Sequence, residues 1–490
     1  MASSQDGEQA PLLRATHHVD DAREPVVGNA PISRLAIIVQ CLLLLFFVGI
    51  GKTLIIRPIN QIQEDILCHK PNMNDTHVLD NYACEDNELS LLRSWIIAFE
   101  SFMSFLAAAP CGMAADTYGR KRVLQLSIAG IILAQAFDAV ICCFPEQFPI
   151  QLVGLKGIWT LIGGGGTILS AMIFTIASDI SLDTQRSTMF FYLTAAAISS
   201  ELLSYPVLLA LTYAGNWVSI YAGFGCLIAS FLITLSLPET LVPDLRSGGP
   251  MIVSDTSIPS FNNFRLTQFL TSMVVLIHRT FSENKKLGML IVFCVFTTTG
   301  NNVALLVTQQ SSQRPDSADI PIFISIFWSS ILKVVLLTMI LPLTSRLLIK
   351  KLRFSPMRKD ISISRASVVA LVAGSLGIAI AKRFQSPIVI AAIYVYALGC
   401  GYSPAMHSLL GHLSGGHHIG MLYATIGAMQ SIGTYIAGLM FGISVEIVPF
   451  IFIFLFLAVV AGTLFCLQLE ETEQGELIWI DLDYLESHSN

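Results

Sequence analysis

The stretch Gly112-Met-Ala-Ala-Asp116-Thr-Tyr-Gly119-Arg120-Lys121-Arg122 joins two long apolar runs, 91–115 and 123–143. Each run is long enough to cross the roughly 30 Å hydrocarbon core of a bilayer as a helix. The chain has to reverse tightly between them, and Gly119 permits this because glycine tolerates positive φ. Three adjacent cations at such a turn stay on the cytoplasmic side of a membrane. The stretch therefore predicts a cytoplasmic hairpin between two membrane-spanning helices.

The composition is that of a multi-pass membrane protein. Apolar residues make up 53% of the 490 residues and charged residues only 13%, against about 25% charged in soluble domains. The mean hydropathy is +0.67. We expect an all-α membrane protein with about twelve transmembrane helices of about twenty residues, at 34–56, 91–114, 123–143, 152–177, 187–211, 216–237, 287–308, 320–343, 365–382, 387–409, 419–443 and 447–467.

A polar stretch divides these helices into two sets of six. We therefore expect two pseudo-symmetric six-helix bundles, with a substrate site near the midplane between them. The expected segments are a disordered cytoplasmic tail at 1–33, a bundle at 34–240, a cytoplasmic linker at 241–286, a bundle at 287–467 and an acidic cytoplasmic tail at 468–490.

The distribution of charge predicts the orientation. Loops that follow even-numbered helices carry far more Lys and Arg than the other loops, so both termini are expected in the cytosol. The net charge of −6 lies largely in the C-terminal tail and gives no support for nucleic-acid binding. Residues 1–33 contain no apolar signal region, so no cleavable signal peptide is expected. The pattern Glu8-Gln-Ala-Pro-Leu12-Leu13 resembles a signal that sorts proteins to a vacuolar or endosomal membrane, and a chance occurrence in a disordered tail is the alternative. The expected location is therefore a vacuolar or endosomal membrane or the plasma membrane.

The turn at 112–122 resembles the G-x-x-x-D-x-x-G-R-K turn between the second and third helices of the major facilitator superfamily. The Pro238-Glu239 pair after the sixth span resembles the end of helix six in that family. The resemblance implies a solute carrier in which this turn acts as a conformational latch between the bundles. By resemblance the latch residues are Gly112, Asp116, Gly119, Arg120, Lys121, Asp179 and Arg186. The alternatives are a topological anchor for the turn and ordinary surface charges for the last two residues.

The loop expected from about Asn60 to Ser90 carries two features of the oxidising side of a membrane. Cys68 and Cys84 share this loop and predict a disulfide, with two free thiols as the alternative. Asn74 begins the sequon Asn-Asp-Thr and predicts a glycosylation site. The sequon agrees with the orientation expected from the charges.

Ionisable residues within apolar spans cost at least ~2.5–3.5 kcal/mol at the bilayer centre and are functional candidates. Glu100, Glu201 and Lys333 lie near the middle of their spans. By resemblance, spans five and eight face each other, so Glu201 and Lys333 can pair across the cavity. Alternatively Glu100 or Glu201 carries a coupling proton, or a static buried ion pair forms. Weaker candidates nearer the outer ends are Lys52, Asp138 and Lys156.

Residues that break helices mark where backbone can line a cavity. The runs 163–166, 297–302 and 399–404 are expected to interrupt spans four, seven and ten. By resemblance these spans line the central cavity. Asn301, Asn302 and Tyr402 are therefore candidates for hydrogen bonding to a substrate, and a purely structural role is the alternative for each.

Other chemistry is not indicated. There is no phosphate-binding glycine loop and no nucleophile–base pattern, so we expect neither an enzyme nor an ATP-driven pump. His412, His417 and His418 lack metal-site spacing, and no metal or cofactor is expected beyond a coupling ion, a proton being the candidate.

The stretch 398–410 resembles carriers of filamentous fungi that are distantly similar to proton-coupled folate-type transporters. That resemblance implies a secondary active transporter that works as a monomer in the bilayer and exports a small organic molecule, a secondary metabolite or toxin. Two alternatives stay open. One is a proton-coupled importer of a nutrient, and the other is a non-transporting receptor built on a carrier fold.

Overall fold

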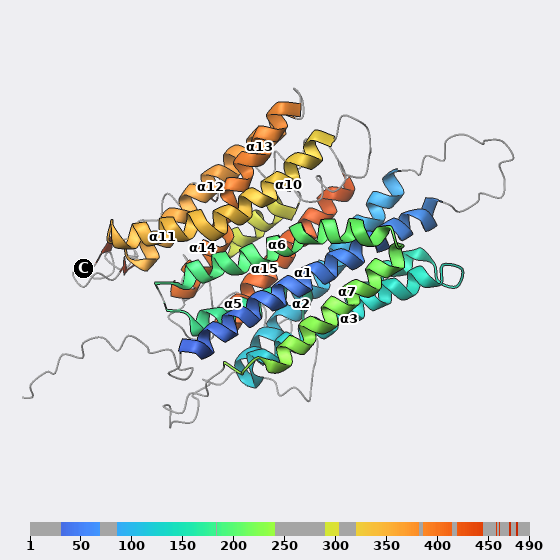
Figure 1. Ribbon diagram of the computed structural model, residues 1–490, viewed down its shortest axis with the longest axis horizontal. Helices are drawn as coiled ribbons and strands as arrows, with labels where there is room; N and C mark the ends of the chain where they lie inside the picture. Colours follow the sequence, from blue (N-terminus) through green and yellow to red (C-terminus); the bar gives the residue numbers. More distant parts are fainter. Residues whose placement is uncertain are drawn as a thin grey trace, which may run out of the picture.

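The structure is a computed structural model that describes residues 31–68, 86–182, 184–240, 290–302, 320–381, 386–413 and 419–443, together with 457, 460, 470–471 and 477–478. Its long helices run side by side along one axis (Figure 1). The elements before the predicted linker are α1 (Pro31–Cys68), α2 (Asp86–Tyr118), α3 (Arg120–Cys143), η1 (Ile150–Lys156), α4 (Gly157–Thr160), α5 (Gly165–Ile180), α6 (Arg186–Thr212) and α7 (Asn216–Ser236).

The elements after the predicted linker begin with a helical segment at 290–302. They continue with α10 (Ile320–Val335), the π-helical η3 (Leu336–Ile340), α11 (Leu341–Lys350), α12 (Pro356–Ala381), α13 (Ser386–Leu398), the short 3₁₀ turn η4 (Gly399–Gly401), α14 (Tyr402–Leu413) and α15 (Ile419–Ile443). Within the described residues the one sheet is a two-residue pairing of β1 (Glu470–Glu471) with β2 (Leu477–Ile478). The predicted all-α class is confirmed.

Eight helices in the described part of the chain are long and apolar enough to cross a membrane. They are Arg34–Leu67, Leu91–Tyr118, Arg120–Cys143, Ile150–Ile180, Arg186–Thr212, Asn216–Ser236, Phe327–Lys350 and Pro356–Ile378. The predicted spans 287–308, 387–409 and 419–443 are helical wherever the structure describes them. The predicted span 447–467 lies almost wholly outside the described residues.

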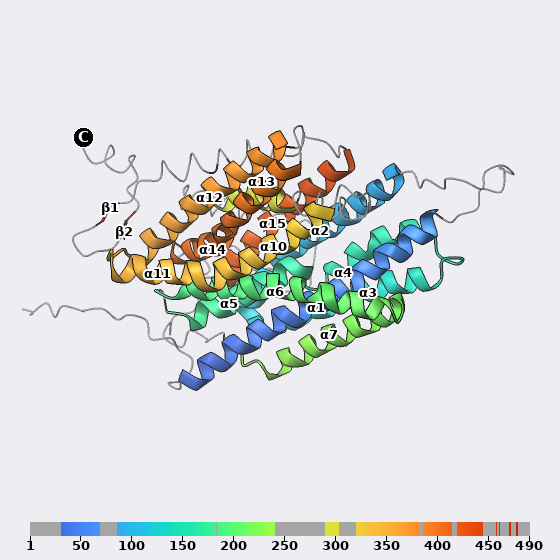
Figure 2. The same cartoon turned by 45° about the horizontal axis from the view of Figure 1, so that its top comes forward.

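The helices lie in two groups with a shared middle. In Figures 1 and 2, α10, α12 and α13 lie along one side and α1, α3 and α7 along the other, with α6 between them. The closest packing in the middle joins α2 to α15, and α5 also packs against α15. Segments far apart in the sequence therefore form the centre of the molecule.

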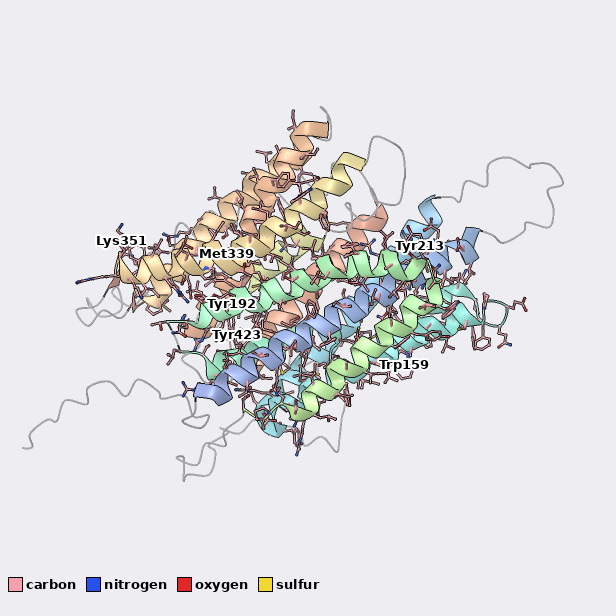
Figure 3. All side chains as sticks on the ribbon, in the orientation of Figure 1. Trp159, Tyr192, Tyr213, Met339, Lys351 and Tyr423 are labelled. Atoms are coloured by element: carbon pink, nitrogen blue, oxygen red, sulfur yellow. The ribbon has the colours of Figure 1, made fainter. Side chains whose placement is uncertain are left out.

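The outside of the bundle is apolar, as a lipid-facing surface requires. Tyr213 at the end of α6 is 87% exposed and Met339 in η3 is 69% exposed. Figure 3 shows both side chains on the periphery, with Tyr213 near one end of the bundle and Lys351 at the other. The C-terminal end of α2, which carries Asp116, lies at the same end of the bundle as Lys351. We name this end of the bundle the Asp116 end.

Two sequence expectations about helix boundaries are wrong. The first outer loop does not begin near Asn60, because α1 continues to Cys68 and buries Gln63. Span seven is not interrupted at 297–302, since residues 290–302 are helical throughout. The threonines fit in that helix because the Thr297 hydroxyl donates to Phe293 O and the Thr299 hydroxyl donates to Val295 O. The predicted loop features Asn74 and Cys84, and the Cys68 side chain, lie outside what the structure describes.

The predicted break in span four is confirmed, whereas span ten changes only to a 3₁₀ turn at Gly399–Gly401 within a continuous helical run. Span four stops at Thr160 and resumes at Gly165. Gly163, Gly164 and Gly165 all have positive φ, of 128°, 79° and 64°. A Cβ at Gly163 would lie 2.6 Å from the backbone of Leu126, so glycine is required there for conformation and for close packing.

A substitution pair tests this reading of the break. Gly163→Ala is expected to destabilise the fold by about 1–3 kcal/mol because alanine disfavours that backbone conformation, and the contact with α3 adds to the loss. Gly225→Ala in α7 is the control, since nothing lies within 4 Å of the added methyl group. The melting temperature of the purified protein in detergent should fall for the first variant only. Equal melting temperatures would contradict the requirement for glycine.

Candidate functional site

The Asp116 side chain joins two distant parts of the chain. The backbone N–H groups of Gly420 and Met421 donate to its Oδ1 and Oδ2 oxygens at 3.1 and 2.9 Å. Both amides belong to the first turn of α15, where helix N–H groups have no intrahelical acceptor and the helix dipole favours an anion. The carboxylate therefore holds the end of α2 against the start of α15.

Two glycines make this contact possible. A Cβ at Gly112 would lie 2.6 Å from the Cβ of Ala424, and a Cβ at Gly420 would lie 2.4 Å from Asp116 Oδ1. Larger residues at either position would push α2 and α15 apart. Gly112 thus has a packing role one turn before Asp116.

The start of α3 is held by Glu239, which follows α7. Its carboxylate accepts hydrogen bonds from Arg120 N at 2.9 Å and Lys121 N at 3.2 Å. Gly119 has φ of 106°, and a Cβ there would collide with the Glu239 carboxylate. The Lys121 ammonium donates to Leu235 O at 2.8 Å. Glu239 was not among the site residues predicted from the sequence, although the Pro238-Glu239 pair marked the position.

Arg120 and Asp179 form an ion pair in which both side chains are largely buried. Asp179, near the end of α5, also accepts a hydrogen bond from the Thr240 hydroxyl at 3.3 Å. Asp116, Arg120, Asp179 and Glu239 thus tie the ends of α2, α3, α5 and α7 to one another and, through Asp116, to α15.

Arg186 lies at the start of α6 and faces a different neighbour. Its guanidinium lies 3.3 Å from His412 Nδ1 on α14. The resemblance joins Asp179 and Arg186 in one cytoplasmic network, and their joint membership of that network stays a prediction.

A second junction at this end was missed in the sequence. Lys359 and Asp360 were expected in a basic loop, but both side chains are 0% exposed in the first turns of α12. The Lys359 ammonium donates to Ser187 Oγ at 2.7 Å and to Thr184 O at 3.3 Å, at the start of α6. It also pairs with Asp360 at 3.3 Å. Pro356 begins α12 early, which draws this charge pair into the bundle.

Asp360 extends the junction to α14. The Ser408 hydroxyl donates to Asp360 Oδ2 at 2.7 Å, and His412 Nε2 lies 3.6 Å from the same oxygen. Figure 3 places Tyr423 of α15 in this region of the bundle, where its hydroxyl donates to His407 O at 3.1 Å. Polar contacts thus join helices from both sides of the predicted linker at the Asp116 end.

Glu201 lies on α6 within electrostatic range of Lys333, Lys52 and Arg57. Within the described residues no ion pair closes between Glu201 and Lys333. Arg57 donates to Tyr205 Oη at 3.1 Å, one helical turn beyond Glu201. The Lys52 ammonium lies beside Gly166 at the start of α5, so it points into the bundle.

Glu100 takes part in a cluster with the two weaker candidates. The Lys156 ammonium lies 2.9 Å from Asp138 Oδ2 and 3.9 Å from Glu100 Oε2. Asp138 is 2% exposed, whereas the Glu100 side chain is 35% exposed. The sequence ranked Asp138 and Lys156 low because each looked like a single charge near the end of a span.

Of the remaining polar candidates, Asn301 and Asn302 already have hydrogen-bond partners. Asn301 Oδ1 accepts a hydrogen bond from Tyr396 Oη at 2.8 Å, and Asn302 Nδ2 donates to Thr434 Oγ1 at 2.7 Å. Tyr402 is 2% exposed, and its buried hydroxyl has no hydrogen-bond partner among the described residues. A substrate would have to replace the hydrogen bonds of Asn301 and Asn302, whereas the Tyr402 hydroxyl has none to give up. Among the described residues no cluster of His, Cys, Asp or Glu could hold a metal ion.

The sequence is similar to fungal membrane transporters. It is 28% identical to the MFS efflux pump atnC of Emericella nidulans, over 96% of this chain and 94% of the relative. It is 25% identical to the MFS-type transporter aprT of Aspergillus flavus, over 89% of this chain and 87% of the relative. No protein-family model matches the chain.

Solved structures identify the fold. The human organic anion transporter MFSD10 superposes with a TM-score of 0.61 at 17% identity, covering 89% of this chain and 99% of that one. The proton:xylose symporter XylE gives a TM-score of 0.61 at 12% identity, covering 89% and 96%. These likenesses show the fold of the major facilitator superfamily, and the sequence relatives belong to a class of transporters, not enzymes.

Removing the charge of Asp116 should loosen the start of α15. Losing charge-assisted hydrogen bonds costs about 1.5–3 kcal/mol, so Asp116→Asn should speed hydrogen exchange of the Gly420 and Met421 amides by about tenfold or more. Mass-spectrometric hydrogen exchange measures this directly. Thr117→Val is the control, because the exposed Thr117 hydroxyl bonds only within its own helix. Unchanged protection in Asp116→Asn would refute the contact.

The buried pair at the second junction gives a separate prediction. Lys359→Met leaves Asp360 as a buried carboxylate without its ammonium, and breaking such a pair costs about 3–5 kcal/mol. The double variant Lys359→Met/Asp360→Leu should lose less than the two single losses combined. Arg358→Met, which changes the exposed cation next to Lys359, should leave the melting temperature nearly unchanged. Additive losses in the double variant would show that the pair is not coupled.

Proposed function

We propose that this chain is a transporter of the major facilitator superfamily that exports a small organic molecule, a secondary metabolite or toxin, by alternating access. Its two six-helix bundles, 34–240 and 287–467, would rock about a substrate site between them. The similarity to the fungal efflux pump atnC supports export over import. We infer that a proton gradient drives the cycle and that a monomer is the working unit.

The observation that carries the proposal is the bond between Asp116 and α15. It joins residues more than 300 positions apart, on opposite sides of the linker, through one carboxylate and two amides. Such a contact can be made and broken without disturbing either helix, because water can replace both hydrogen bonds at the end of the bundle. A contact that closes one end of a transporter during alternating access has to form and break reversibly in this way.

The orientation follows from the charges at the Asp116 end. Arg120, Lys121 and Arg122 lie there, and Figure 3 places Lys351 at the same end. Under the positive-inside rule this end faces the cytosol, together with both termini. The membrane would be the plasma membrane or a vacuolar or endosomal membrane, and closure at the Asp116 end corresponds to a state closed to the cytosol.

Deletion of the gene tests the exported substrate. Untargeted metabolomics of medium and cells should find a compound retained in the deleted cells and depleted from the medium, relative to the parent strain. Reintroducing the gene should restore its release. A compound that instead stays unconsumed in the medium of the deletion strain would make the protein an importer and overturn the export proposal.

Glu201 and Lys333 provide a test of the transport cycle. We propose that they approach one another in another conformation, because they lie on α6 and α10, which pack together from different bundles. Glu201→Gln and Lys333→Met should each lower flux of the identified compound in proteoliposomes by about tenfold, the effect of about 1.4 kcal/mol. The double variant should recover part of the loss. Glu146→Gln, at an exposed loop, is the control, and full flux in both single variants would sink the pairing.

A further inference from the structure

The cluster of Glu100, Asp138 and Lys156, which we name the Asp138 cluster, lies apart from both junctions at the Asp116 end. It brings α2, α3 and the end of η1 together. Gly157 allows this approach, since a Cβ there would lie 2.9 Å from Glu100 Cα. The Lys156 ammonium therefore reaches between two carboxylates that belong to different helices.

The charges of this cluster do not balance. Two carboxylates share one ammonium, so the three groups together carry one net negative charge, close to the buried Asp138. One bound proton would make the cluster neutral, with the Asp138–Lys156 pair at its buried side and Glu100 at its more exposed side. The cluster thus has the stoichiometry of a site for a single proton.

Hydrogen bonding marks the oxygen that would receive the proton. Asp138 Oδ2 accepts from Lys156, but Asp138 Oδ1 is buried and has no donor among the described residues. Gln135 lies one turn earlier on the same face of α3, and its Oε1 is also buried without a donor. A proton bound at Asp138 Oδ1 would turn that oxygen into a donor, and Gln135 Oε1 is an acceptor one turn away on the same helix.

Three other titratable groups interact with Asp138. The neighbouring groups are the Glu100 carboxylate from α2, the Lys156 ammonium from η1, and the Cys142 thiol from the next turn of α3, which is hydrogen-bonded to Gln63 of α1. Glu100 is the most exposed of these charged groups. It offers a route by which a proton can enter and leave.

We propose that the Asp138 cluster is the binding site of the coupling proton, which binds at Asp138 Oδ1 and exchanges with water past Glu100. The proposal rests on the proposed function for its role in transport. Binding takes one proton from water and changes the cluster from one net negative charge to neutral, while the Lys156 ammonium keeps its protons. Release returns the same proton to water on the other side of the membrane after the bundles have rocked.

Infrared difference spectroscopy of the full-length protein in lipid tests the site without a substrate. On acidification the wild type should gain the C=O stretching band of one protonated carboxyl group. Asp138→Asn should abolish the band, and Asp138→Glu should move its frequency without removing it. Glu146→Gln, a change at an exposed carboxylate, should leave it in place. A wild type without the band, or a band that persists in Asp138→Asn, would overturn the proposal.

The variants also separate this proposal from the proposed function. The elution profile and the melting temperature report whether Asp138→Asn folds. If it does not fold, Asp138→Glu serves as the test, and a carboxyl band at the wild-type frequency in that variant refutes the site. In proteoliposomes, Asp138→Asn should exchange the exported compound across the membrane when the pH is equal on both sides. It should fail to accumulate the compound when a pH gradient is imposed. Accumulation at the wild-type level would refute the site. Absence of flux for every compound, with the band intact, would defeat the exporter while leaving the proton site standing.

Discussion

A carboxylate at the start of a helix is the interaction on which the arrangement of this molecule depends. Asp116 accepts two hydrogen bonds from the first turn of α15, and this bond fixes how the segments before and after the linker meet at one end. The contact requires glycine at positions 112 and 420, because any side chain would separate the helices. It also requires a rigid turn after Asp116, which Glu239 provides by holding the start of α3. Residues far apart in sequence thus serve one bond.

The low dielectric of a membrane protein makes each buried charge depend on its partners. At the Asp116 end, Arg120 is held by Asp179 and Lys359 by Asp360, so these charges lie at helix junctions in matched pairs. Farther along the bundle the charges are less evenly matched. Glu201 lies near three cations, and the Asp138 cluster has more carboxylates than ammonium groups. The matched pairs suit a structural junction, whereas the unmatched groups suit sites that bind and release charge.

The sequence was sufficient where a local rule decides the structure. The turn at 112–122, the helix limits around it and the break at Gly163 follow from apolar length and from positions that only glycine can occupy. It was insufficient where a side chain's partner lies on another helix. Lys359 looked like a loop cation because its neighbours in the sequence are basic, and its partners on α6 lie more than 170 positions away. The threonines at 297–299 looked like a helix break, yet their hydroxyls bond to the preceding turn and leave the helix intact.

The central claim is that the two ends of the bundle open alternately. It is tested most directly by electron paramagnetic resonance distances in liposomes, with one spin-label pair at Tyr118 and Leu422 near the Asp116 end. The second pair is Leu91 and Leu439, at the opposite ends of α2 and α15, which pack antiparallel. Our account predicts two distances for each pair, with the short distance at one end accompanied by the long distance at the other as conditions change. A single distance at both ends, or distances that lengthen together, would contradict it.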